Sequence, residues 1–573
     1  MIAKTRKLTA ALVAAGVLSA ATLTGPVVAQ EVSNTGTGTA VFIPYYTIND
    51  GWRTLFNIHN TSDSSLAVKV RLHEARNSRD VLDFVVLLSP FDVWTAWIQE
   101  GADGQPRLQT NDRSCTVPLS VRDNGASASA LAYSGVFNDH SATNNDISRM
   151  SEGYIEILVM GEVTNGLSED GVPWPTRDNG AQGFAPGDAD TRNNLTNPGA
   201  ANFRGSTAWF AKHVNGEPRN CQIIQNDFVT RAGTWAGGAA AIPGEEGSGS
   251  PYARLLRGFP GFTPWDDEEG IKVGYGPIET TAPLKVNASL IKESDGLAAG
   301  VESLHISGWG VGENLMAAQQ FPWFLEPSLA SGEGLWTTGN LDDINEGIEA
   351  LVVANEWANN PNTGASTDWV VTFPTKRFQA DEDALNVQAA CSIWRNDDVV
   401  TGGTPVGSAG TRWWAPFGAG VTPFGPERLL GANCPDLDFP NVFQAQNDGK
   451  ADLKVEYTIF DREEGSVVVV VDGPVISPAP PADVEISSLP YEVNVLSFGS
   501  GSVDSALDSL IAESVDTSVL ASNARTGWAA VGFLLDNEEA AAYPVTGFIF
   551  KKRDFNNPGL NYGQATEHGY VRP

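Results

Sequence analysis

Period-two alternation of apolar and polar residues recurs along this chain and constrains its fold more than any other feature. Successive side chains of a β-strand point to opposite faces, so such a segment forms a strand with one apolar and one polar face. In the segment 66–73, four apolar residues alternate with Ala67, Lys69, Arg71 and His73. Segment 453–459 alternates in the same way, and its KVEY echoes the KVRL of the first segment. This pattern predicts half-buried strands, and the echo indicates either common ancestry or shared strand composition.

Other segments of strand length follow the same pattern or are rich in β-branched and aromatic residues. Clusters of Asn, Asp, Gly, Ser and Pro separate them, and the chain contains 59 Gly and 34 Pro, which favours many turns. We therefore predict a mainly β fold of antiparallel, Ig-like sandwich sheets with long loop-rich insertions and little helix. Two short helices are predicted, one after Asp342, with entry into a strand as the alternative, and one over Ser502–Glu513. The further strand segments are Ala40–Ile43, Thr54–His59, Val81–Leu88, Gly153–Val159, Leu284–Ile291, Trp369–Phe373, Tyr491–Phe498, Gly527–Leu535 and Thr546–Lys551.

The strand pattern divides the 573 residues into regions. Residues 30–165 form a β-sandwich region and residues 276–573 a second β-rich region, which either packs with the first as one body or stands apart. Residues 166–275 are rich in Gly, Asn, Asp and Pro and are expected to form a loop-rich insertion.

The N-terminus has the organisation of a secretory signal peptide over residues 1–29. Lys4, Arg6 and Lys7 precede the apolar run Leu8–Leu23, and small residues lead to a cleavage site after Ala29. The alternative, a membrane anchor, is disfavoured by the modest hydrophobicity of the apolar run and by the small residues at the cleavage site. No later run reaches the length of a transmembrane helix, so we expect an exported protein, extracellular or on the outer cell surface, with the periplasm as the alternative.

The charge of the chain restricts its partners. The formal net charge is −33, and loss of the leader removes three basic residues and makes the mature chain more acidic still. Phosphate backbones and anionic lipids are repelled by such a chain, so nucleic acid is excluded as a partner.

Four cysteines remain after the leader, which in an exported protein predicts two disulfides. Three pairings are open, and the sequential one keeps each bridge within its own half of the chain. No CxxC motif occurs, which excludes thioredoxin-like and zinc-ribbon chemistry. The cysteines are Cys115, Cys221, Cys391 and Cys434.

Three segments carry a resemblance to other proteins. They resemble segments of uncharacterised exported β-rich proteins of Gram-negative bacteria. The segments are Ile43–Trp94, which contains IPYYT and NSRDVLDF, Ala350–Trp357 (ALVVANEW) and Thr367–Lys376 (TDWVVTFPTK). The resemblance implies export and a β-rich fold. It implies no activity and no catalytic residue.

Motifs for catalysis were sought and not found in the sequence. His73 begins a pattern like HExxH but lacks the second histidine, and no Walker loop or G-x-S-x-G elbow occurs. His59 and His73 lie on neighbouring predicted strands, where a solvent-facing pair is favoured over a metal site. A pair of carboxylates for glycoside hydrolysis leaves no spacing signature in sequence, so this activity stays open, although a non-enzymatic protein is favoured.

Two candidate binding sites lie in loops. Asp188, Asp190 and Asn193 are clustered oxygen donors of the kind that Ca²⁺ prefers, with solvated Asx turns as the favoured alternative. Trp413 and Trp414 are candidates for stacking on sugar rings, whereas Trp94, Trp369 and Trp528 on strands are expected in the core.

These observations favour a secreted or cell-surface structural or adhesive β-protein that assembles with itself. Its extended N-terminal stretch Glu31–Thr39 is a candidate donor strand for another copy, with a short flexible tail as the alternative. The competing hypothesis is a carbohydrate-binding or carbohydrate-active extracellular protein whose partner is a surface polysaccharide.

Overall fold

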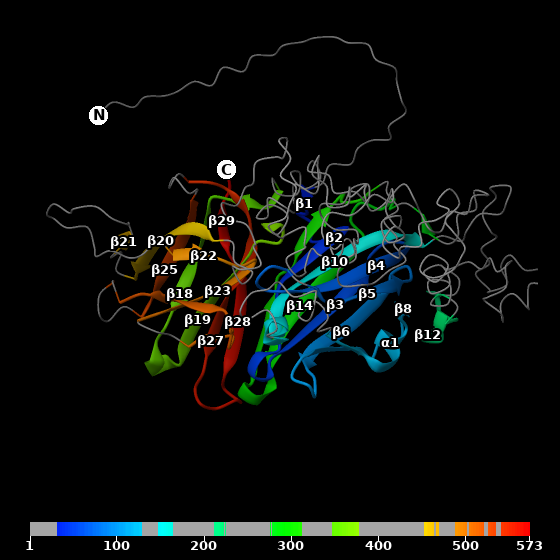
Figure 1. Ribbon diagram of the computed structural model, residues 1–573, viewed down its shortest axis with the longest axis horizontal. Coiled ribbons are helices and arrows are strands. Elements are labelled where there is room, and N and C mark those ends of the chain that lie inside the picture. The colour runs from blue at the N-terminus through cyan, green and yellow to red at the C-terminus, as the bar shows by residue number, and fades with distance from the viewer. Residues whose placement is uncertain are drawn as a thin grey trace, which may run out of the picture.

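The computed structural model describes a mainly β protein built from four principal sheets in two sandwiches (Figure 1). The described residues are 31–78, 80–128, 147–163, 211–222, 224, 275–276, 278–311, 347–376, 452–462, 466–468, 487–500, 504–518, 520, 525–534 and 540–573. The predicted fold class is confirmed.

The first sandwich consists of sheets A and B. Sheet A has the strand order β1-β16-β2-β10-β4-β5-β8, with β13 also pairing with β10, and sheet B the order β15-β14-β3-β6-β7-β9. The strands of sheet A are β1 (Glu31–Val32), β2 (Ala40–Thr47), β4 (Ser65–Glu74), β5 (Asp80–Leu88), β8 (Thr116–Val117), β10 (Glu152–Val163), β13 (Tyr275–Gly276) and β16 (Leu304–Ser307). Those of sheet B are β3 (Arg53–Asn60), β6 (Val93–Glu100), β7 (Pro106–Gln109), β9 (Ala126–Ser127), β14 (Leu284–Lys292) and β15 (Leu297–Val301).

The second sandwich consists of sheets C and D. Sheet C has the order β21-β20-β25-β18-β29, with β22 also pairing with β20, and sheet D the order β24-β23-β19-β27-β28. Sheet C comprises β18 (Val352–Ala358), β20 (Leu453–Asp461), β21 (Ser466–Val468), β22 (Ser487–Leu489), β25 (Thr526–Leu534) and β29 (Gly569–Val571). Sheet D comprises β19 (Ala365–Thr372), β23 (Val493–Gly499), β24 (Ala512–Asp516), β27 (Thr546–Arg553) and β28 (Tyr562–Glu567). All pairings within these four sheets are antiparallel except β23 with β24.

Short elements complete the described chain. Helix α1 (Ser120–Asn124) is accompanied by the 3-10 turns η1 (Asn49–Gly51), η4 (Ile147–Ser151), η6 (Glu293–Asp295) and η7 (Pro361–Thr363). Two-stranded pairs are formed by β11 (His213–Val214) with β12 (Glu217–Pro218) and by β17 (Glu349–Ala350) with β26 (Tyr543–Pro544).

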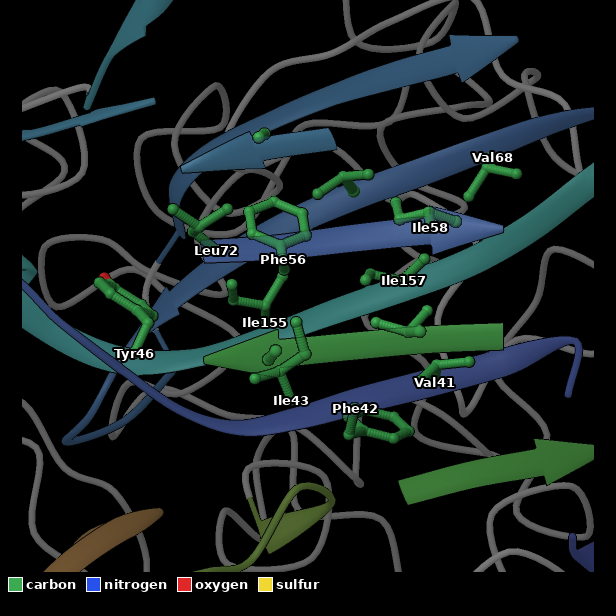
Figure 2. Close-up of a cluster of buried hydrophobic side chains, with 14 of the residues drawn as sticks. Val41, Phe42, Ile43, Tyr46, Phe56, Ile58, Val68, Leu72, Ile155 and Ile157 are labelled. Atoms are coloured by element: carbon green, nitrogen blue, oxygen red, sulfur yellow. The ribbon is translucent and has the colours of Figure 1, made fainter. Parts of the chain in front are cut away.

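The core of the first sandwich follows directly from the alternation in the sequence. The apolar residues of β4 and β10 face those of β3, as Figure 2 shows for Val68, Leu72, Ile155, Phe56 and Ile58, and all five are buried. Burial of each such side chain stabilises the fold by about 1.5–3 kcal/mol. The strands therefore form where one face finds an apolar partner sheet.

Aromatic contacts join the two sandwiches. One face of sheet D packs against sheet C, whereas its other face contributes to the core of the first sandwich. Here the ring of Trp52 meets that of Phe550 at a centroid distance of 5.5 Å, and Tyr45 meets Phe548 at 6.4 Å. The second sandwich is therefore attached to the first through shared apolar packing.

Segment 504–511 also joins the two sandwiches through polar contacts. The carboxylate of Asp368 in β19 accepts hydrogen bonds from the Ser505 hydroxyl and the Leu507 amide, at 2.6 and 2.9 Å. A few residues further on, the Ser509 hydroxyl and Leu510 amide donate to Glu152 in the first sandwich, at 2.7 and 2.8 Å. The segment thus bridges β19 and β10 with its hydrogen bonds satisfied.

Some predictions of organisation need correction. A boundary at residue 276 does not follow the sheets, because β14 pairs with β3 and β16 pairs with β2. Residues 284–307 thus complete the first sandwich. The helix predicted over Ser502–Glu513 is wrong, since residues 504–511 form turns and β24 begins at Ala512. There, sheet pairing and the segment's side-chain contacts override a weak local helical pattern. Of the segment after Asp342, Gly347 and Ile348 are helical, and the chain then enters β17 and β18.

The disulfide prediction is confirmed in its first half. Cys115 and Cys221 are bonded, with their Cα atoms 5.2 Å apart, and the bridge ties the short β11–β12 region to sheet A next to β8. Cys391 and Cys434 lie outside the described residues.

Candidate functional site

The outer face of sheet A carries a cluster of ionisable side chains, which we call the charged cluster: Lys69, Arg71, His73, Asp83 and Glu156. Its first contact is the ion pair between Lys69 on β4 and Asp83 on β5. Nζ lies 2.9 Å from Oδ1, and the two side chains are 0% and 1% exposed. Burial raises the pKa of the Asp83 carboxyl, against the opposing effects of Lys69 and Arg71.

The second part of the cluster centres on Glu156 of β10. Its Oε2 lies 3.0 Å from Nε2 of His73 and 4.0 Å from Nη1 of Arg71. Nδ1 of His73 lies 2.9 Å from the carbonyl oxygen of Ser78, and the imidazole stacks on the ring of Tyr154. Both imidazole nitrogens therefore face oxygen atoms.

The charged cluster is enclosed, because its side chains are at most 3% exposed in every ion pair. Buried charges are costly unless they are paired and hydrogen-bonded, so this arrangement fixes β4, β5 and β10 relative to one another. The enclosed position does not suit the cluster for contact with an external ligand.

The outer face of sheet C offers the opposite environment. Trp528 of β25 is 46% exposed, and its ring stacks on that of Phe460 of β20 at a centroid distance of 4.1 Å and an interplanar angle of 10°. The prediction that Trp528 is a core residue is therefore wrong. Trp94 and Trp369 are fully buried, as predicted.

Small and polar residues continue the surface around this stack. Register places Phe460, Trp528 and Glu356 in one row across three strands, and Thr458, Ala530 and Ala354 in the next row on the same face. Rows on one face of a sheet are about 6.6–6.8 Å apart, so a flat strip of small side chains lies beside the aromatic pair. We call these six residues the aromatic platform.

A close backbone approach holds the aromatic row in place. A Cβ on Gly527 would lie 1.7 Å from the carbonyl oxygen of Phe460 and 2.9 Å from Nε1 of Trp357. The indole of Trp357, buried beneath the sheet, donates to that same carbonyl at 3.2 Å. Glycine at this position therefore lets the core tryptophan fix the strand that carries Phe460.

The candidate site residues from the sequence fall elsewhere. The proposed calcium ligands Asp188, Asp190 and Asn193 and the proposed stacking residues Trp413 and Trp414 lie outside the described residues. Within the part that the structure describes, no group of three or more His, Cys, Asp or Glu side chains is arranged to hold a metal ion.

The two histidines considered as a pair lie on different sheets. His59 on β3 of sheet B contacts Asn57 at 2.8 Å, whereas His73 on β4 of sheet A is buried in the charged cluster. The expectation that both face solvent is wrong for His73, because the polar face of β4 is covered.

No known protein family, curated protein or solved structure matches the chain. Among the described residues, no helix is both long enough and apolar enough to cross a bilayer. The functional argument therefore depends on the geometry of the chain itself.

Proposed function

We propose that the protein is a secreted adhesive β-protein that binds surface polysaccharide through the aromatic platform, without catalysis. The observation that carries this proposal is the exposed Trp528–Phe460 stack on the outer face of a sheet. Sugar rings present C–H groups on their flat faces, and these pack favourably against the electron-rich face of an aromatic ring. The signal peptide predicted from the sequence supports export, and the sequence motifs favour a non-enzymatic role.

The composition of the platform suits a neutral polysaccharide. Thr458 and Glu356 lie in or beside the aromatic row and supply a hydroxyl and a carboxylate for sugar hydroxyl groups. Ala354 and Ala530 leave room for a ring to approach the sheet. A strongly acidic glycan is disfavoured by the net charge of −33.

A panel of immobilised polysaccharides, probed with the mature protein, tests the proposal. We expect binding to at least one neutral polysaccharide, and a weakening of about tenfold to a hundredfold in Trp528→Ala and Phe460→Ala, as for other aromatic anchors. Tyr562→Ala is the matched control, since Tyr562 is 50% exposed but lies on β28 of sheet D. Binding that is unchanged in Trp528→Ala would overturn the proposal, as would equal loss in Tyr562→Ala.

A second candidate function is self-association by strand exchange, and it is supported by the position of the N-terminal segment. Glu31 and Val32 form β1 at the edge of sheet A and pair with Ser307 and Ile306 of β16. Gly38 is pressed against Ile306, whose carbonyl oxygen would lie 2.5 Å from a Cβ on this glycine. The segment thus pairs with β16 of its own chain, and β16 of a second copy would offer it the same pairing.

Light scattering at low and high salt tests this second candidate. Because screening reduces repulsion between acidic copies, we expect more association at high salt, and loss of the effect when residues 30–39 are deleted. A monomer at every ionic strength, or association unaffected by the deletion, contradicts it.

A further inference from the structure

We propose that Lys69 and Asp83 are joined by an intramolecular isopeptide bond, an amide between Nζ of Lys69 and Cγ of Asp83. The proposal concerns the charged cluster of sheet A, and it does not rest on the polysaccharide site of sheet C.

The geometry brings the two reacting groups together on neighbouring strands. In the antiparallel pair β4–β5, Lys69 lies opposite Val85 and Asp83 lies opposite Arg71, so the two side chains are diagonal neighbours on one face. Their polar atoms are 2.9 Å apart. Strand pairing thus holds the amine against the carboxyl group at a high effective concentration.

The surroundings favour the neutral carboxylic acid that amide formation needs. Both side chains are almost completely excluded from solvent, and burial raises the pKa of Asp83. Oδ2 of Asp83 is buried and has no hydrogen-bond partner. An ion pair in such a place bears a large desolvation cost, and transfer of a proton from Nζ to Oδ1 within their 2.9 Å hydrogen bond gives an amine beside a carboxylic acid.

The reaction balances without any other reactant. The Nζ lone pair attacks Cγ and forms the C–N bond, and the oxygen Oδ1 leaves as water with its own proton and one from nitrogen. Nζ keeps its last hydrogen as the amide N–H, and Oδ2 becomes the amide carbonyl. Arg71, directly opposite Asp83 and electrostatically coupled to its carboxyl, is placed to stabilise the negative charge that develops on the carboxyl group during attack.

Two other lysines that form ion pairs with carboxylates differ from Lys69 in exposure. Lys551 pairs with Glu356 with side chains 23% and 59% exposed. Lys292 is largely buried, but each of its carboxylate partners is at least 28% exposed. Among these contacts, only that of Lys69 with Asp83 excludes water from both members.

Mass spectrometry of the mature protein, denatured and with its disulfides reduced, tests the proposal. We expect an intact mass about 18 Da below that of the sequence, the mass of one water. Trypsin does not cleave after an acylated lysine, so digestion is expected to yield one species that links peptide 54–71 to peptide 80–107.

Variants assign the missing water to this pair. Lys69→Arg keeps the buried charge but cannot form the amide, and Asp83→Ala removes the carboxyl, so each is expected to regain the full mass. Lys551→Arg, the matched control in the exposed pair, is expected to keep the deficit. An intact mass equal to that of the sequence, with cleavage after Lys69, would overturn the proposal, as would a deficit without the linked peptides, which indicates a cyclised aspartate instead.

Discussion

Strands β4 and β20 have the same alternating pattern, yet their polar faces lie in opposite environments. The polar face of β4 carries Lys69, Arg71 and His73, all buried in paired contacts. The polar face of β20 carries Lys454, Glu456, Thr458 and Phe460, all partly exposed. The comparison teaches that alternation specifies which side chains share a face, whereas the covering of that face is decided elsewhere in the chain.

The difference also separates structural from binding roles. A buried charge must be paired, so the polar face of β4 is restricted to residues that complete an ion pair or a hydrogen bond. The polar face of β20 is under no such constraint and carries an aromatic ring that stacks on Trp528. An exposed aromatic pair beside small residues suits recognition, and an enclosed charged cluster suits rigidity.

The largest expected effect comes from removing the buried carboxyl group of Asp83 in the first sandwich, compared with the exposed carboxylate of Glu356 in the second. Asp83→Ala leaves Lys69 buried without the Asp83 carboxyl group and is expected to lower the free energy of unfolding by about 3–5 kcal/mol. Glu356→Ala, which breaks the exposed pair with Lys551, is expected to cost about 0–1 kcal/mol. Urea denaturation followed by fluorescence measures both, and equal losses would contradict the contrast.

Acid should destabilise both sandwiches, since each contains a buried neutral histidine. Burial lowers the pKa of His305 and of His568 to about 4 from the usual 6.5. Each imidazole donates from one nitrogen to a carbonyl, and the other nitrogen of His305 accepts from the Val286 amide at 3.0 Å. Protonation would remove that acceptor.

The sign of the pH dependence follows from the lowered pKa values. The unfolded chain binds these protons first as pH falls, so stability is present above pH 6.5 and is lost towards pH 4, by about 3 kcal/mol for each histidine. Urea midpoints between pH 7 and 4 measure the loss. His305→Gln should flatten part of the profile, and an unchanged slope in that variant would refute the assignment.

Two glycines of β25 allow a sharper test of how the aromatic row is held. Gly527→Ala would place Cβ 1.7 Å from the Phe460 carbonyl oxygen, so we expect a loss of about 1–3 kcal/mol from forced displacement of the strands. Gly532→Ala is the matched control on the same strand, because the nearest atom there is 3.9 Å away. Thermal unfolding of the two variants should therefore differ, and similar melting temperatures would count against the close approach.

The smallest effect is expected for the exposed tryptophan. Trp528→Ala removes one ring of a surface stack and should cost about 0.5–1.5 kcal/mol, against about 3–5 kcal/mol for the buried Trp369→Ala. Denaturation of the two variants checks the ranking. A large loss of unfolding free energy in Trp528→Ala would mean that this residue stabilises the fold. Weaker polysaccharide binding by that variant would then reflect its loss of stability.

Much of the fold was predictable, because strand patterns are local. The strands around Leu66–His73, Leu284–Ile291 and Leu453–Ile459 were all expected, and the described β-strands cover them. The Cys115–Cys221 bridge agreed with sequential pairing. The aromatic platform was missed, since Trp528 sits in a strand pattern like that of a core residue. The available signal was its phase: Ala529, Val531 and Phe533 of β25 point inward, and Trp528 has the opposite parity.

The sequence by itself determined the class of fold and the apolar face of each strand, since these depend on composition and on spacing along one segment. Only the tertiary structure decided which sheets pair across the chain, that β14 and β16 complete the first sandwich, and which polar faces are covered. The physical reason is that burial depends on what packs against a face. Lys69 and Lys454 occupy equivalent places in similar strands, but Lys69 is buried against a carboxylate, whereas Lys454 is partly exposed.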